Sequence, residues 1–191
     1  MSISASLVKQ LREQTGAGMM DCKRALEQTT GNMEAAIDVL RKKGAANAER
    51  KAGRIASEGI IGQWISDDGS QAVMVEVNCE TDFVAKDESF CGFVAEILQV
   101  IAVNRPTDLE ALGELALGAS GSVNETRLVL IGRVGENIGI RRFECIEAAF
   151  GSVLSGYLHG QRIGVVMGVQ GGQSTLGRDL AMHVAASRPL A

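Results

Sequence analysis

The sequence has few of the residues that build metal centres. Its 191 residues include four cysteines and two histidines, and no two cysteines form a CxxC pair. A structural zinc site usually draws four such ligands from short spacings. We therefore expect no metal and no cofactor, and we interpret the cysteines as reduced thiols in the core.

Long apolar runs and an excess of positive charge are also absent. No run approaches the roughly 20 apolar residues that cross a bilayer, so we expect no membrane partner. The formal charge is −4, and one Tyr and one Trp leave little for base stacking. A short basic stretch at 42–54 is typical of a solvated helix and linker. We expect no nucleic-acid partner.

The composition is that of a folded protein with two or three modules. It is 46% hydrophobic, which excludes a disordered chain. The N-terminus carries charge within its first ten residues and has no apolar h-region, so it does not resemble a signal peptide. We expect a cytoplasmic location. The oligomeric state stays open, and an oligomer is compatible with the sequence.

Residues 1–45 are predicted to form a module of three short helices. Ser4 or Ser6 can cap the first helix, which Thr15 and Gly16 end. The second ends near Gly31, and the third is predicted to end at Gly44. Such a module is marginal alone and needs a neighbour. A helical basic linker is expected over 46–57.

Residues 58–134 are predicted to form a first core subdomain. Two strand-like runs flank the hairpin signal Asp67–Ser70. Apolar residues then recur at helical spacing from Phe90 to Ile101 behind a cap at Asp87 or Ser89. The stretch CETDFVAKDE (Cys79–Glu88) is thus a strand-to-helix loop. Two short helices follow at about 108–117 and 123–134.

A second subdomain is predicted over 135–191. The runs RRFECIEAAF, SGYLHG and IGVVMGV are strand-like, and LGRDLAMHVAAS is an amphipathic helix. AVMVEVN, a helix and Arg-Pro in the first subdomain have a counterpart in GVVMGVQ, a helix and Arg-Pro in the second. The predicted fold class is α+β: three helices, then two related strand-strand-helix subdomains.

Glycine clusters and apolar side chains in polar surroundings are the remaining candidates for sites. GRVGENIG and GVQGGQ lack the spacing of phosphate-binding loops, so we interpret both as turns. Met19 and Met20 cannot both face a small core, so one of them is expected to be exposed. Phe83 has two interpretations, a core ring or a ring for a partner.

The motifs TGAGMMDCKRAL, VNCETDFVAKDESF, GENIGIRR, YLHGQRIGV and AMHVAAS, in this order, resemble bacterial translation elongation factor Ts. The resemblance spans nearly the whole chain. It implies a ubiquitin-associated-like N-terminal module and guanine nucleotide exchange on elongation factor Tu, in its GDP-bound and nucleotide-free forms. Such a factor is not an enzyme in its own right, and no direct nucleotide binding is expected.

The resemblance also assigns contact residues. It implies that Thr81, Asp82, Phe83 and Val84 disturb the magnesium site of the GTPase, with the ring wedged between two of its helices. It places Met19, Met20 and Lys23 on the nucleotide-binding domain, and Tyr157, Leu158 and His159 on a distal domain.

Two alternatives and one departure remain. A small cytosolic enzyme could use Cys79 or Cys145 as nucleophile with His159 as base. A nucleic-acid-binding module that uses the basic linker is a weaker alternative. Family members carry an inserted coiled-coil hairpin and a C-terminal module, whereas this chain stops just after Ser187. It is either a piece of a longer protein, with the second subdomain incomplete, or a naturally short form.

Overall fold

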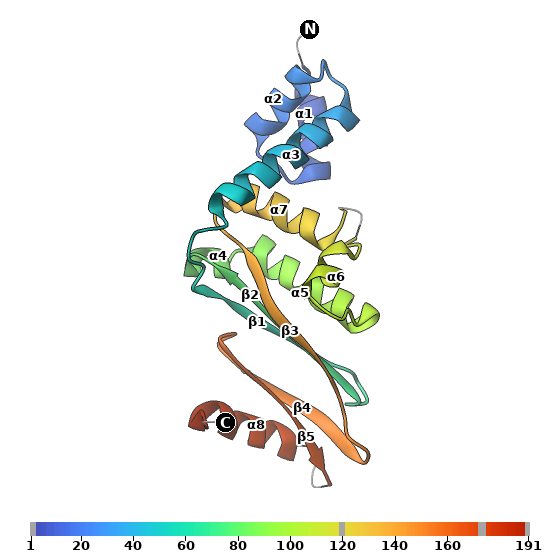
Figure 1. The fold of residues 1–191 in the computed structure, drawn as a ribbon, viewed down its shortest axis with the longest axis vertical. Coiled ribbons are helices and arrows are strands. Elements are labelled where there is room, and N and C mark those ends of the chain that lie inside the picture. The colour runs from blue at the N-terminus through green and yellow to red at the C-terminus, as the bar shows by residue number, and fades with distance from the viewer. Residues whose placement is uncertain (1–2, 119–120, 172–174, 190–191) are drawn as a thin grey trace.

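The computed structural model describes residues 3–118, 121–171 and 175–189. The molecule is elongated, with the N-terminal helices at one end and the C-terminal helix at the other (Figure 1). Helices and strands are both present, as the α+β prediction requires. The elements are α1 (Ala5–Thr15), α2 (Met19–Gln28), α3 (Met33–Lys51), β1 (Glu58–Ile65), β2 (Gln71–Cys79), α4 (Asp82–Ala85), α5 (Glu88–Asn104), α6 (Leu109–Glu114), α7 (Val123–Val134), β3 (Gly139–Glu147), β4 (Ser152–His159), β5 (Ile163–Gln170) and α8 (Leu176–Ser187).

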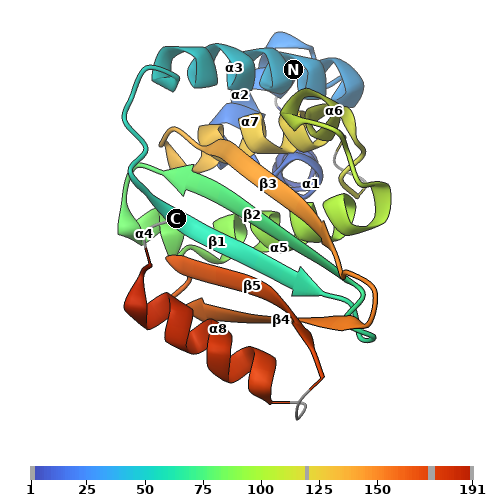
Figure 2. The ribbon, with the colours of Figure 1, turned by 60° about the horizontal axis from the view of Figure 1, so that its bottom comes forward.

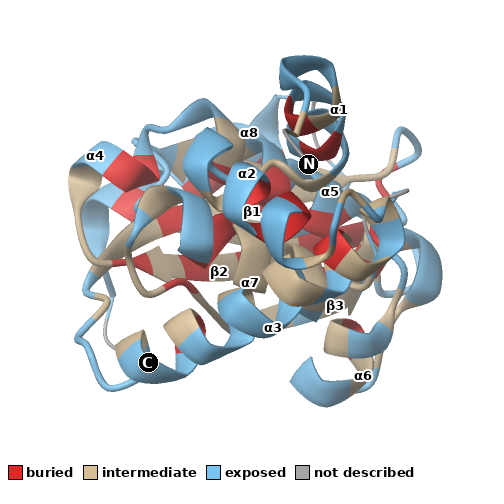
Figure 3. Cartoon of the chain, turned by 90° about the horizontal axis from the view of Figure 1, so that it is seen from above, coloured by how far each residue is buried: buried red, intermediate tan, exposed pale blue. Residues whose placement is uncertain are grey.

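The first two N-terminal helices and the start of the third lie where the sequence predicts them. The Ser4 side chain accepts a hydrogen bond from the Leu7 amide and starts α1, and Gly16 ends the helix in the left-handed conformation. A small core of its own holds the module together: Val8, Leu11, Cys22, Ala25, Leu26 and Ala36. In the view from above, buried and exposed stretches follow one another along α1 (Figure 3).

Helix α3 does not end at Gly44 as predicted; it continues to Lys51. A Cβ atom at Gly44 would lie 3.5 Å from the carbonyl oxygen of Leu128 on α7. Gly44 therefore lies inside the helix, where α3 packs on α7, and even an added Cβ would be at ordinary van der Waals distance from α7. Arg41 reinforces this packing with an ion pair to Glu125, 2.9 Å away. The first part of the expected linker is thus helix, and the module boundaries stay predictions.

A three-stranded antiparallel sheet, in the order β1-β2-β3, carries the main core. Helix α5 covers it with six buried side chains, all from the predicted apolar stripe: Phe90, Phe93, Val94, Ile97, Leu98 and Ile101. Strand β3 falls within the range assigned to the second subdomain, yet it pairs with β2. Its partner is more than 60 residues away, and strand periodicity carries no information about such pairing.

Strands β4 and β5 form a separate hairpin that α8 covers on its outer side (Figure 2). Three hydrogen bonds tie this hairpin to β1: Ile61 N donates to the Gln161 carbonyl at 2.7 Å, Gln63 Nε2 donates to the Val165 carbonyl at 3.0 Å, and the Arg162 guanidinium donates to the Glu58 carboxylate. Like β1, β2 and α5, this unit runs strand, strand, helix. That the two units are related stays a prediction.

The structure covers only part of the glycine cluster GVQGGQ, which we predicted to be a turn. Gly172 and Gln173 lie outside the described residues. Within the ranges that the structure describes, no helix is long and apolar enough to cross a membrane.

Gly59 should be indispensable to the β1–β2 pairing. Its φ is +142°, and an added Cβ would lie 2.2 Å from the Val77 carbonyl oxygen. Because that atom belongs to the partner strand's backbone, it cannot move aside. We expect Gly59→Ala to lower the free energy of unfolding by about 1–3 kcal/mol, measured by urea titration. Gly53→Ala, with no atom within 4 Å of its added Cβ, is the matched control. Equal stability of the two variants would contradict the prediction.

Candidate functional site

The turn between β2 and α5 is a single helical turn with a cap at each junction. The Thr81 hydroxyl accepts from the Val84 amide at 3.4 Å and starts α4. The Asp87 carboxylate accepts from the amides of Ser89 and Phe90, at 2.9 and 3.3 Å, and starts α5. The backbone therefore reverses direction in a defined conformation within the stretch from Glu80 to Asp87.

The two sides of this turn have opposite environments. Val84 and Ala85 are buried against the main core, whereas the Phe83 side chain is 82% exposed. The core interpretation of Phe83 is therefore wrong for the free chain. A ring of this size left in water forgoes roughly 1.5–3 kcal/mol of burial free energy. It is available for contact with another molecule.

Asp82 is a carboxylate on the same exposed side. Lys86 Nζ donates to it at 2.7 Å, and this hydrogen bond and charge hold the pKa of Asp82 below its usual value. The positive charge of Arg162, in the turn between β4 and β5, acts in the same direction. Asp82 is thus ionised at neutral pH, and the β4–β5 turn lies close enough to influence it.

Glu136 holds the start of this turn through hydrogen bonds, and the sequence did not predict this role. One carboxylate oxygen, Oε2, accepts from the amides of Glu80 and Thr81 at 3.1 and 3.0 Å. The other, Oε1, accepts from the Thr81 hydroxyl at 2.6 Å. The residue lies in the cluster GENIG, which we interpreted only as a turn. Its acidic side chain at a strand entry was the available signal.

Met19 and Met20 open helix α2 and both lie on the surface. Their side chains are 59% and 58% exposed, although only one was expected to be. Lys23, one turn further along, is also exposed and lies 3.9 Å from Glu27. The first turn of α2 thus presents two flexible apolar side chains beside a cation, at the end of the molecule remote from α8 (Figure 1).

Tyr157, Leu158 and His159 occupy the last positions of β4 before a turn at Gly160. The Tyr157 hydroxyl lies 3.1 Å from His159 Nδ1. His159 is exposed, while Tyr157 and Leu158 are half-buried. The charge of Arg162, in the adjoining turn, lowers the pKa of Asp82, and in Figure 1 the β4–β5 turn and α4 lie on the same side of the molecule.

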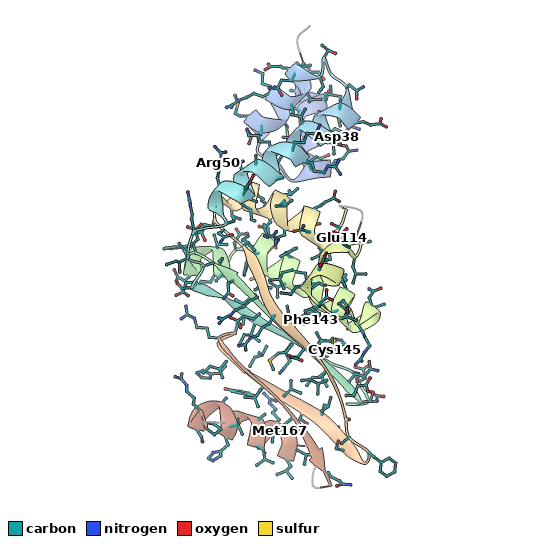
Figure 4. The ribbon with its side chains drawn as sticks, viewed as in Figure 1. Asp38, Arg50, Glu114, Phe143, Cys145 and Met167 are labelled. Atoms are coloured by element: carbon teal, nitrogen blue, oxygen red, sulfur yellow. The ribbon has the colours of Figure 1, made fainter. Side chains whose placement is uncertain are left out.

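The cysteines do not form a nucleophilic site with His159. Cys79 is fully buried, its thiol donates to the Thr81 carbonyl at 3.2 Å, and burial, then the charge of Glu136, raises its pKa to about 11. Cys145 lies near the end of β3 that leads toward β4 (Figure 4), and burial raises its pKa too. His159 is the last residue of β4, in a hairpin separate from the sheet that holds Cys79 and Cys145. Among the described residues, no cluster of His, Cys, Asp and Glu could hold a metal.

The Cys79 thiol should resist alkylation. With a pKa of about 11, only about one thiol in a thousand is ionised at pH 8, and the sulfur is buried. We expect iodoacetamide to leave Cys79 unmodified in the native chain and to modify it in urea, as read by peptide mass spectrometry. Stoichiometric native labelling at pH 8 within minutes would revive a nucleophilic role.

Comparisons with known proteins place the chain. A model of the family described as Elongation factor TS matches residues 80–191. The whole chain is 56% identical to the elongation factor Ts of Thioalkalivibrio sulfidiphilus and 50% identical to that of Hydrogenovibrio crunogenus, in each case spanning 64% of the relative's length. The elongation factor Ts of Idiomarina loihiensis is 50% identical over 189 residues, 99% of this chain and 63% of the relative. The chain therefore belongs to the elongation factor Ts family.

Proposed function

We propose that this chain acts in translation as a guanine nucleotide exchange factor for elongation factor Tu. The observation that carries the proposal is Phe83, an exposed ring on a turn fixed at both ends. The relatives that bear the family name are about half again as long as this chain, so activity and partner are proposals for it. The factor would bind both the GDP-bound and the nucleotide-free GTPase.

Exchange of this kind needs no contact between factor and nucleotide. A protein that binds the empty GTPase more tightly than the GDP-bound form must weaken GDP affinity by the same factor. Binding of GTP then releases the factor by the same linkage. In this proposal the chain therefore needs neither chemistry of its own nor a binding site for GDP. We also propose that it works in the cytoplasm.

Phe83 is proposed to enter between two helices of the GTPase near its magnesium ion. Magnesium sites use few protein ligands together with phosphate and water, so a small displacement of the protein shell loosens the nucleotide. Burial of the ring supplies roughly 1.5–3 kcal/mol. A coupling of that size changes nucleotide affinity by roughly ten- to a hundredfold. Burial of this one ring could therefore supply a substantial part of the loss of nucleotide affinity.

The residues around Phe83 divide the remaining work. The ionised Asp82 is placed to compete for contacts that hold the magnesium-binding region of the partner. Thr81 caps the turn and Val84 fixes its inner side in the core, so these two hold the ring in place. The magnesium-dislocating segment is thus the whole of 81–84, with different tasks on its two sides.

Two further segments are proposed to dock. Met19, Met20 and Lys23 would lie on the nucleotide-binding domain, and Tyr157, Leu158 and His159 on a distal domain. We further propose that the N-terminal module is ubiquitin-associated-like and that the core comprises two related strand-strand-helix subdomains. Release of labelled GDP from elongation factor Tu, with and without this chain, tests the activity directly: no acceleration at saturating factor would refute it.

Removing the Phe83 ring should separate function from folding. We expect Phe83→Ala to reduce factor-stimulated GDP release by about tenfold or more, since the burial free energy of the ring is lost. The free energy of unfolding should change by less than about 0.5 kcal/mol, because the ring is exposed. Phe90→Ala, which removes a fully buried ring, should instead cost about 3–5 kcal/mol of stability. A Phe83→Ala variant with normal exchange would contradict the wedge.

Met20→Asp should weaken docking without unfolding the module. A carboxylate in the first turn of α2 is compatible with the helix dipole, so the free chain stays folded. On binding, that carboxylate would be buried without a partner, which costs several kcal/mol. We expect at least a tenfold rise in the Kd for elongation factor Tu, measured by titration calorimetry. Met182→Asp, at an exposed methionine on α8, is the matched control; equal effects of the two changes would exclude a specific role for Met20.

A further inference from the structure

We propose that Glu136 is the positioning residue that holds the Phe83 turn in its active conformation. The inference rests on the proposed exchange function for its consequence, but its structural basis is independent of it. Residue 136 lies between α7 and β3, more than 50 positions from the turn, and its carboxylate reaches across to the end of β2.

The hydrogen bonds of Glu136 determine the orientation of the Thr81 hydroxyl. That hydroxyl has one hydrogen, which it donates to Glu136 Oε1 at 2.6 Å. The Thr81 hydroxyl oxygen also accepts a hydrogen bond from the Val84 amide at 3.4 Å, and this bond caps α4. Glu136, Thr81 and Val84 thus form a continuous chain of hydrogen bonds, in which each bond polarises the next. The last member belongs to the turn that carries Phe83.

A carboxylate accepts every hydrogen bond that this site offers. Three donors converge on the Glu136 side chain: two backbone amides and one hydroxyl. An ionised carboxylate is purely an acceptor with two oxygens, and its bonds are charge-assisted. Glutamine has the same length but would present an NH₂ group to one set of these donors. The change Glu136→Gln therefore keeps the volume but removes the negative charge and one of the two acceptor oxygens.

A reciprocal bond links the two segments a second time. Glu80 Oε1 accepts from the Asn137 amide at 2.6 Å, so each segment supplies a carboxylate to the backbone of the other. Asn137 Nδ2 in turn donates to the Arg54 carbonyl at 3.0 Å, in the segment that follows α3. We call this set of bonds the Glu80–Glu136 clamp. It joins the Phe83 turn to the connection that leads to the N-terminal module.

The first test needs no partner. Hydrogen–deuterium exchange of the free chain, read in peptides covering 80–86, should be at least about tenfold faster in Glu136→Gln than in the parent, while peptides from β1 and α5 keep their protection. Glu114→Gln, at an exposed glutamate on α6 (Figure 4), is the matched control and should match the parent. Unchanged exchange in 80–86 would overturn the positioning role.

The second test asks whether Glu136 acts through the ring. With elongation factor Tu, Glu136→Gln should lower the maximal rate of GDP release by about tenfold and raise the half-saturating factor concentration much less. In a Phe83→Ala background it should add nothing, since the group that it positions is gone. Equal losses in the two backgrounds would contradict the proposal.

A second variant and the parent chain complete the design. Thr81→Val removes the hydroxyl link with little change of shape and should reproduce both effects of Glu136→Gln, so the test stands even if Glu136→Gln folds poorly. Normal protection of 80–86 against hydrogen exchange together with a normal rate of GDP release in Thr81→Val would overturn the proposal. If the parent chain itself fails to accelerate GDP release, the proposed function fails, and the hydrogen-exchange result alone still decides whether Glu136 positions the turn.

Discussion

The chain passes within a few residues from β2, a strand of the main sheet, to α5, which covers that sheet with six buried side chains. This short connection determines the shape of the Phe83 turn. Cys79 and Phe90 are both fully buried, so the connecting backbone is fixed at its two ends. A single helical turn fills the gap. Its inner side, Val84 and Ala85, completes the core, and its outer side must then face water. The exposed Phe83 follows from this geometry, and its apolar surface is not used in the chain's own core.

The same frame connects the segments proposed to meet the partner. Helix α3 leaves the N-terminal module, crosses α7 at Gly44 and Leu128, and ends near the segment that Asn137 holds. The Glu80–Glu136 clamp joins that segment to the Phe83 turn, and Arg162, in the β4–β5 turn, pairs with Glu58 at the start of β1. Docking residues at one end of the molecule and the ring near its middle therefore share one packed framework (Figure 1).

Local chemistry was predictable from the sequence, and distant pairing was not. The apolar spacing from Phe90 to Ile101, the hairpin at Asp67–Ser70 and the cap at Ser4 each depend on residues a few positions apart, and each prediction is confirmed. Gly44 misled because a glycine that ends a helix and one that lies inside a helix look alike in sequence. The partnership of β2 with β3 and that of Thr81 with Glu136 span more than 50 residues, a separation at which periodicity says nothing. Exposure of Phe83 needed the structure, since its neighbours are equally compatible with a core position.

The central claim is that Phe83 itself enters the GTPase. A photoreactive benzoylphenylalanine at position 83 tests it most directly, with the same group at the still more exposed Phe150 as the comparison. After irradiation with nucleotide-free elongation factor Tu, the account predicts a crosslink from position 83 to the region around the magnesium site of the partner, and none from position 150. A complex that forms but yields no crosslink from position 83, or yields one outside the nucleotide-binding domain, would contradict the account.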